Sequence, residues 1–193
     1  MNNNLKILKF FVENKDKEFT IKKVAETLNI NYRIAYEEIM SLKEENLIRI
    51  KKQGNSNISK FNYNYSSKNV EVEHIRKKEL FKNRNIKLIH NRIKEIKNPF
   101  YILILFGSYA DKSNTKSSDI DICLITDNKK VNKQVNDIVS ITPLNLHLQE
   151  FTTHDFLKMI KSKETNVGND IIKNNIILYG IESFYKLVNN VKY

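Results

Sequence analysis

The spacing of hydrophobic residues changes near residue 98. Before that point they recur every three or four positions, as on helices with one buried face. This pattern predicts three helices, one over residues 4–14 capped by Asn4, one after a Thr20 cap and one after an Asn31 cap. A first domain, residues 1–66, is completed by a strand over 47–52, a turn over 53–57 and a returning strand over 58–65.

Residues 68–97 are strongly basic, with ten Lys and Arg against four Glu. Their hydrophobic residues keep a roughly helical spacing, which predicts one long helix or two helices with a break near Asn83–Asn85. Asn98-Pro99 ends the segment, because proline disfavours helix in the residue before it. We expect residues 67–98 to form a basic helical link between two domains.

From Phe100 onward, apolar runs of strand length alternate with helical segments. The predicted strands cover 101–106, 119–126 and 144–150. The predicted helices follow Gly107-Ser108, cover 129–141, begin near Thr153, cover 167–178 before a stop at Gly180, and cover 181–190. Residues 99–193 are therefore expected to form a second domain, a mixed sheet with helices, and the fold class is α+β.

Asp119 and Asp121 lie two positions apart in the second of these strands. Side chains alternate across a strand, so both carboxylates point to one face, about 7 Å apart along the chain. Two carboxylates at that spacing can share a divalent cation, and they repel each other without one. Gly107 lets the backbone approach a ligand closely, and a helix opening at Ser108 directs free N–H groups toward a phosphate.

The segment Gly107-Ser108-Tyr109-Ala110, followed by Ser118-Asp119-Ile120-Asp121, resembles the Gly-Ser…Asp-x-Asp signature of DNA polymerase beta-like nucleotidyltransferases of the minimal type. The resemblance covers roughly residues 99 to 180 and implies a sheet with helices on one side. It further implies that Asp119 and Asp121 hold two Mg²⁺ ions, while Gly107 and Ser108 bind the β- and γ-phosphates of a nucleoside triphosphate. The implied reaction transfers a nucleoside monophosphate, AMP from ATP, to an acceptor.

The family usually supplies a third carboxylate from the strand that here begins at Leu144. In this chain the alternating polar residues of that strand are Asn145, His147 and Gln149, none of which is acidic. Glu150 is the only acidic residue of this strand. By alternation its side chain points to the same face as the leucines of the strand, unless a bulge turns it to the other face. His147 and Glu150 are therefore the candidate third ligands or bases, and a catalytically degenerate, nucleotide-sensing site is the alternative.

Residues 1–66 resemble the winged helix-turn-helix DNA-binding domains of prokaryotic regulators, through Thr-Ile-Lys-Lys-Val-Ala-Glu-Thr-Leu-Asn-Ile and the basic hairpin. Such domains insert their third helix into the major groove. The resemblance implies the following DNA-binding residues: Asn31, Tyr32, Arg33 and Tyr36 on the helix, with Lys51 and Lys52 on the wing. The alternative is a protein-interaction or dimerisation module, favoured by four acids on the same helix, Glu37, Glu38, Glu44 and Glu45.

Charge separates the two halves of the chain. The net charge is +11, and residues 1–98 carry 22 Lys and Arg against 12 Asp and Glu, whereas residues 99–193 carry 11 against 10. This asymmetry favours a polyanion as the partner of the N-terminal half.

Composition excludes several classes of protein. No apolar run reaches the ~18 residues of a membrane span, and no signal peptide is recognisable. Cys123 is the single cysteine, so a disulfide framework is excluded and a cytoplasmic protein is expected.

Three functions remain open at this level. The first is an enzyme that modifies a hydroxyl of a partner protein, as antitoxin-type minimal nucleotidyltransferases do, or a small molecule such as an aminoglycoside. The second is a winged-helix regulator that senses a nucleotide, and the third is an enzyme that extends RNA ends. The sequence leaves the acceptor and a homodimeric state undecided.

Overall fold

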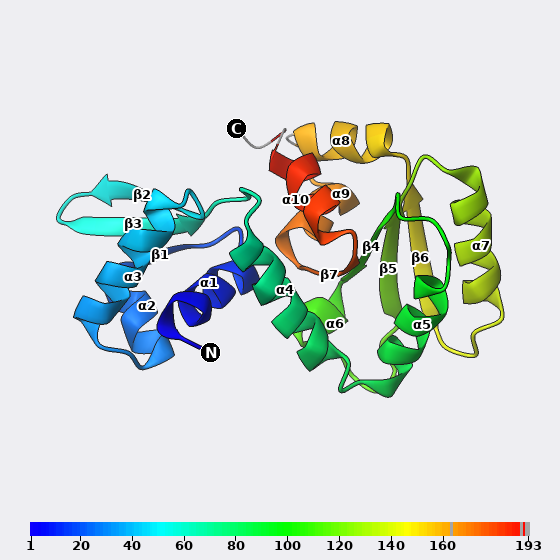
Figure 1. Cartoon of the computed structure of the whole chain (residues 1–193), viewed down its shortest axis with the longest axis horizontal. Coiled ribbons are helices and arrows are strands. Elements are labelled where there is room, and N and C mark those ends of the chain that lie inside the picture. The colour runs from blue at the N-terminus through cyan, green and yellow to red at the C-terminus, as the bar shows by residue number, and fades with distance from the viewer. Residues whose placement is uncertain (163, 190, 192–193) are drawn as a thin grey trace. The chain divides into compact units, whose positions relative to one another are not determined.

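A computed structural model describes residues 1–162, 164–189 and 191, and its elements are labelled in Figure 1. The chain divides into two compact units, Met1–Val72 and Glu73–Tyr193. The predicted α+β class is confirmed, since each unit combines helices with a sheet. One helix, α4 (Ser67–Leu80), runs across the boundary between the units.

The N-terminal unit places three helices and a hairpin in the predicted order. Its elements are α1 (Asn3–Glu13), β1 (Glu18–Thr20), α2 (Ile21–Leu28), α3 (Tyr32–Glu44), β2 (Ile48–Gln53) and β3 (Ser56–Phe61). The predicted Thr20 and Asn31 caps are confirmed, because their side chains accept hydrogen bonds from the N–H groups of Lys23 and Arg33. Asn4 was the wrong cap for α1. Asn2 caps that helix, and Asn4 lies buried inside it.

The spacing of hydrophobic residues in the sequence did not predict β1, which has only three residues. It pairs antiparallel with β3, and β3 pairs antiparallel with β2, in the sheet order β1-β3-β2. So short a strand leaves no detectable alternation in the sequence, and it forms because β3 offers it an edge. The helices bury Ile7, Leu8, Phe11, Val24 and Ile39 in the core of this unit.

The basic segment forms two helices, α4 and α5 (Arg84–Lys94), in agreement with one of the two predictions. The break lies at Asn83, whose side chain caps α5 by accepting from the N–H groups of Asn85 and Ile86. On α5, the side chains of Ile86, Ile89 and Ile93 are buried in the core of the C-terminal unit. This helix is therefore part of that unit's fold.

The C-terminal unit is built on a four-stranded mixed sheet in the order β6-β5-β4-β7. The strands are β4 (Ile102–Phe106), β5 (Ile120–Ile125), β6 (Leu146–Phe151) and β7 (Asn175–Tyr179). β4 is antiparallel to both β5 and β7, and β5 is parallel to β6. The helices of this unit after α5 are α6 (Ser108–Asp111), α7 (Lys129–Ser140), α8 (Thr153–Lys161), α9 (Val167–Lys173) and α10 (Ile181–Asn189).

Helices cover both faces of this sheet, where one covered face was expected. The face that carries Leu103, Leu105 and Ile122 packs on α5 and α7. Ile104 and Cys123, which point to the other face, are also fully buried, and α9 and α10 contact β4 on that side (Figure 1). Both faces are therefore covered over β4, β7 and most of β5, whereas β6, at the edge of the sheet, is partly exposed along its length.

The predicted helix over 167–178 was wrong in its second half. α9 ends at Lys173, and Ile176 to Leu178 belong to β7. The Asn175 side chain donates to the carbonyls of Ile171 and Ile172 and so closes the end of α9. The β-branched residues Ile176 and Ile177, with Tyr179 after them, suit a strand, and β4 supplies the partner. The predicted helix over 181–190 is α10, with residue 190 outside the described residues.

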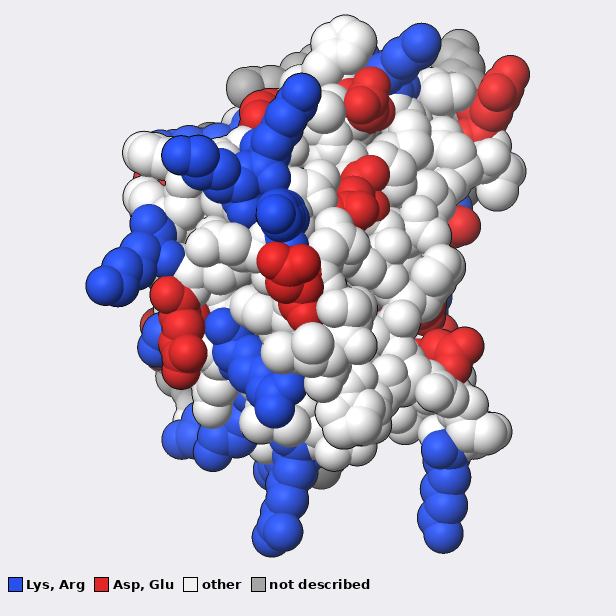
Figure 2. Space-filling view, turned by 90° about the vertical axis from the view of Figure 1, so that its right-hand side faces the viewer, with Lys and Arg blue, Asp and Glu red and all other residues white. Residues whose placement is uncertain are grey.

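No helix in the described part of the chain is long and apolar enough to cross a membrane. Figure 2 shows the face that carries α7, where basic and acidic side chains are interspersed. This mixture agrees with the near balance of charge in residues 99–193.

Candidate active site

Gly107 forms a tight turn between β4 and α6. Its φ of +67° lies in the left-handed region that favours glycine. A Cβ atom added at this position would lie 2.3 Å from Oδ2 of Asp121, too close for any side chain. The missing side chain therefore allows the backbone of the turn to lie directly against the Asp121 carboxylate.

Asp121 lies in β5 between two structural neighbours. The strand register pairs it with Phe106, the residue before Gly107, and on the other side with His147 of β6. Nδ1 of His147 lies 3.2 Å from Oδ1 of Asp121. The two side chains are 60% and 25% exposed, so solvent and ligands can reach this pair.

Gln149 extends the row of polar side chains along β6. Its Nε2 lies 3.1 Å from Nε2 of His147. In this orientation the amide of Gln149 faces Nε2 of the ring, and Nδ1 of the ring faces Asp121. Sequence reasoning noted Gln149 as polar but did not select it for the site, although alternation along β6 already placed it beside His147.

Asp119 lies just before β5, is exposed, and shares the alternation of Asp121. Among the residues that the structure describes, no three His, Cys, Asp or Glu side chains are gathered closely enough to hold a metal ion. The donors that do meet are an oxygen of Asp121 and a nitrogen of His147, with Asp119 at the start of the same strand. This mixed set of two carboxylates and an imidazole fits a divalent cation in its chemistry.

Glu150 is not brought to this site. Its Oε1 accepts a hydrogen bond of 2.5 Å from Nδ2 of Asn136 on α7. Leu146 and Leu148, which share its alternation along β6, pack on the core beneath α5 and α7. Glu150 therefore projects to the opposite face of the sheet from His147, and no bulge in the β5–β6 pairing turns it back.

The other predicted groups are placed as follows. Ser108 begins α6 directly after the glycine, at the same end of the sheet as Asp121. Cys123 shares the alternation of Asp121 but is fully buried, and burial raises the pKa of its thiol far above the ordinary value. The thiol is therefore protonated and packed in the core at neutral pH.

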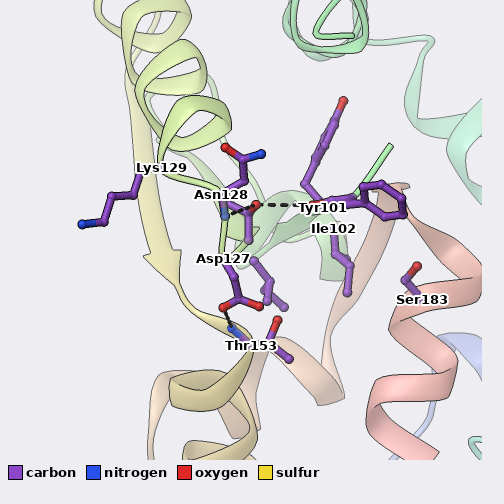
Figure 3. A pocket seen from close by; sticks show the side chains of 10 residues that line it. Tyr101, Ile102, Asp127, Asn128, Lys129, Thr153 and Ser183 are labelled. Carbon is purple, nitrogen blue, oxygen red and sulfur yellow. Dashed lines mark hydrogen bonds between the residues drawn. The ribbon is translucent and has the colours of Figure 1, made fainter. Parts of the chain in front are cut away.

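A pocket of about 600 Å³ lies at the other end of the sheet (Figure 3). Ile102 and Ile125 pair at the pocket, whereas Phe106 and Asp121 pair at the candidate site. Four residues of strand, about 13 Å, separate the two ends. The Asp127 carboxylate in this pocket already accepts from the N–H of Thr153 at the start of α8, so the helix end there is satisfied within the chain.

The predicted DNA-binding residues lie on α3 and β2. Tyr32 and Tyr36 are 54% and 40% exposed, and their rings lie side by side, with centroids 6.5 Å apart. The Arg33 guanidinium is exposed and forms an ion pair with Glu37. Asn31 is exposed, and as the cap of α3 its side chain accepts a hydrogen bond from the N–H of Arg33. Lys51 and Lys52 are exposed on β2.

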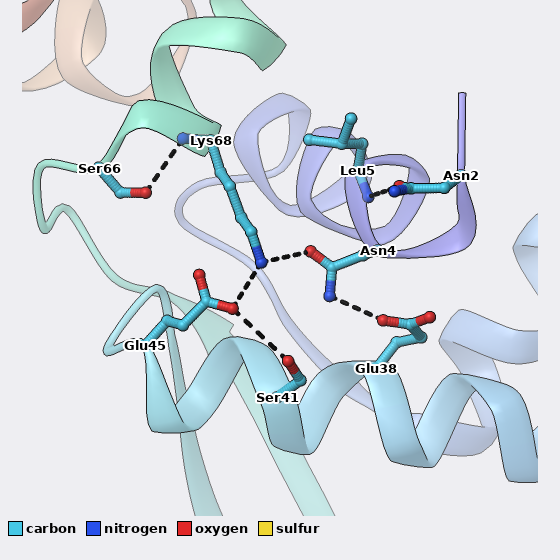
Figure 4. A network of polar contacts seen from close by, with 8 residues as sticks. All are labelled: Asn2, Asn4, Leu5, Glu38, Ser41, Glu45, Ser66 and Lys68. Atoms are coloured by element: carbon cyan, nitrogen blue, oxygen red, sulfur yellow. Dashed lines mark hydrogen bonds and ion pairs between the residues drawn. The ribbon is translucent and has the colours of Figure 1, made fainter.

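Two of the four acids on α3 are engaged inside the N-terminal unit (Figure 4). Glu38 accepts from Nδ2 of Asn4 at 2.7 Å, and Glu45 accepts from Nζ of Lys68 at 2.5 Å. With Glu37 paired to Arg33, three of these acids have a polar partner within the unit. These acidic side chains therefore oppose the binding of a polyanion less strongly than the sequence suggested.

The profile of the family described as polymerase beta, nucleotidyltransferase matches residues 85–183, just over half of the chain. The chain belongs to this family. No curated protein matches the chain. Among solved structures, a "possible transcriptional regulator" from Methanosarcina mazei Go1 aligns with a TM-score of 0.32 and 15% identity, over 51% of this chain and 80% of that protein.

Proposed function

We propose that the protein is a nucleotidyltransferase that depends on a divalent cation and moves AMP from ATP to an acceptor. The observation that carries this proposal is the contact between the Gly107 turn and the Asp121 carboxylate. A family that transfers nucleotides must hold a triphosphate close to metal-binding carboxylates. The turn and the carboxylate meet here at the end of two paired strands.

Each residue then has a defined role. Asp119 and Asp121 would hold the cation, which would supply positive charge for the attacking and leaving oxygens of the transfer. Gly107 leaves room for the triphosphate beside the backbone, and Ser108 offers its hydroxyl and N–H to the phosphate oxygens. His147 contacts Asp121 and therefore lies beside the place where the cation would bind.

The exposure of the site supports a large acceptor. Asp119 is exposed and the His147 side chain is 60% exposed, so the reacting groups lie at the rim of the sheet. A hydroxyl carried by a protein can reach such a site, which favours an antitoxin-type activity on a partner protein over a fully enclosed small substrate.

Incubation of the whole chain with α-³²P-ATP and a cell lysate, with Mg²⁺ or Mn²⁺, tests this proposal. Label should appear on a discrete acceptor with the intact protein and with Asp137→Asn, a control on the exposed surface of α7. It should disappear in the Asp119→Asn, Asp121→Asn double variant. Undiminished labelling by the double variant would refute the assignment. Saturable ATP binding without any label would favour the nucleotide-sensing regulator instead.

We further propose that the N-terminal unit binds duplex DNA as a winged helix-turn-helix. The exposed Tyr32, Arg33 and Tyr36 on α3, together with Glu38 and Glu45 engaged inside the unit, support this second function. Aromatic and guanidinium groups can contact bases, and lysines on the wing can contact phosphates. Fluorescence anisotropy of the whole chain with labelled duplex at several salt concentrations tests it, because phosphate contacts produce a steep fall in affinity with salt.

A further inference from the structure

The pair formed by His147 and Asp121 has the spacing of two ligands on one cation. Ligand atoms bound at about 2.1–2.2 Å and at right angles lie about 3.0 Å from each other. Nδ1 of His147 and Oδ1 of Asp121 lie 3.2 Å apart, on adjacent parallel strands in register. A small movement of either exposed side chain therefore places both atoms on the same ion.

We propose that His147 is a metal ligand, and that the site formed with Asp119 and Asp121 takes a divalent transition metal such as Mn²⁺ in preference to Mg²⁺. Mg²⁺ favours oxygen ligands alone, whereas imidazole suits transition metals. Among the described residues no third carboxylate is gathered with Asp119 and Asp121, and Glu150 is held by Asn136 on the other face of the sheet. This inference rests on the proposed nucleotidyltransferase site and specifies its metal.

Gln149 has the position needed to support a bound imidazole. In the structure its amide nitrogen faces Nε2 of His147 at 3.1 Å, while Nδ1 faces Asp121. When Nδ1 binds a metal, the single proton of the neutral ring sits on Nε2. A half-turn of the Gln149 amide then presents its oxygen to Nε2–H, which is the contact that orients metal-bound histidines.

A purely structural role explains the pair less well. The two side chains are 60% and 25% exposed, and hydrogen-bonded pairs at such exposure add little to stability. β6 lies at the edge of the sheet and is already fixed by its ladder to β5 and by Leu146 and Leu148 in the core. The fold therefore does not depend on the imidazole at this position, which leaves the ring available to bind a cation.

Electron paramagnetic resonance of Mn²⁺ with the whole chain tests the proposal without measuring activity. Inorganic tripolyphosphate replaces the nucleotide, so that no base nitrogen contributes to the signal. Spin-echo modulation from a bound ¹⁴N nucleus is expected with the intact protein and with His154→Ala, a control in which another exposed histidine is removed. The modulation should be absent in His147→Ala.

Metal preference gives a second readout. His147→Asp converts the donor set to carboxylates alone, so the affinity for Mn²⁺ relative to Mg²⁺ should fall about 10-fold or more. Mn²⁺ binding that depends on Asp121 but shows no nitrogen modulation would overturn the role of His147 and leave the proposed function standing. Nitrogen modulation in a protein that never labels an acceptor would support the site while refuting the transfer. Absence of Mn²⁺ binding by the intact protein would overturn the inference.

Discussion

The Arg76 guanidinium donates to the Glu73 carboxylate at 2.6 Å, and both side chains are buried. A second guanidinium nitrogen donates to the carbonyl of Asn175, and the Tyr185 hydroxyl donates to the other Glu73 oxygen. One turn of α4 is thereby tied to the start of β7 and to α10. Glu73 and Arg76 of α4 thus form buried hydrogen bonds that join this helix to the rest of the C-terminal unit.

Removing one partner of this buried pair should be costly. Glu73→Ala leaves the Arg76 charge buried without its carboxylate, and we expect a loss of about 3–5 kcal/mol in the free energy of unfolding. Lys78→Ala, on the exposed side of the same helix, should change it by less than about 0.5 kcal/mol. Urea unfolding followed by circular dichroism measures both, and equal stabilities would show that the network contributes nothing.

A fragment that begins at residue 99 should not fold. It lacks α5, whose Ile86, Ile89 and Ile93 are buried against the sheet, and it lacks Arg76. Loss of three buried isoleucines alone removes roughly 6 kcal/mol or more of burial, comparable to the whole stability of a domain. A fragment covering 73–193 should fold. Dispersed amide resonances in the shorter fragment would contradict this expectation.

Gly107→Ala should abolish ATP and metal binding. The new methyl group would collide with the Asp121 carboxylate, and the left-handed backbone adds strain. Gly54→Ala is the matched control, because Gly54 has a φ of +57° but nothing lies within 4 Å of an added Cβ. Calorimetric titration with ATP and Mn²⁺ compares them. The assignment of the Gly107 turn fails if both variants bind as the intact protein does.

Arg33→Ala should weaken binding of duplex DNA and reduce the salt slope by about 1, if the guanidinium contacts a phosphate. The side chain is exposed on α3, and its partner Glu37 lies on the same helix. Lys17→Ala removes an exposed charge of the same unit outside α3 and the wing. Anisotropy titrations in which both variants lose affinity equally would indicate that charge alone, and not α3, governs binding.

The C-terminal unit should lose stability as the pH falls below about 6.5. Burial lowers the pKa of His90, and the nearby Lys77 and Lys94 lower it further, against hydrogen bonds with Asn91 and Leu178 that raise it. The unfolded chain therefore binds a proton that the folded chain excludes, and stability declines through the unfolded pKa. His90→Phe should reduce the fall in the urea midpoint between pH 7 and 5.5, leaving the effect of His74, whose pKa is also lowered by burial and by Lys77. His154→Ala, at an exposed position, should leave the fall in the midpoint unchanged.

Local chemistry determined much of what the sequence revealed. The Thr20 and Asn31 caps act within three residues, so their positions could be predicted without knowing the fold. The Asn83 cap lies where the basic segment was expected to break if it formed two helices. Likewise, Gly107-Ser108 and the alternation of Asp119 and Asp121 depend on a single turn and a single strand. These signals were sufficient to predict the α+β class and the nucleotidyltransferase family.

The tertiary structure decided which distant groups meet. β7 formed from residues predicted as helix because β4 offered its edge, and Glu150 turned to Asn136 because β6 keeps a regular register. The same register brought the His147 side chain next to that of Asp121, although the two residues are 26 positions apart in the sequence. Strand pairing depends on partners far along the chain, and no local pattern encodes it. The sequence by itself therefore determined the chemical groups of the site, and only the tertiary structure decided that an imidazole, and not a third carboxylate, stands beside Asp121.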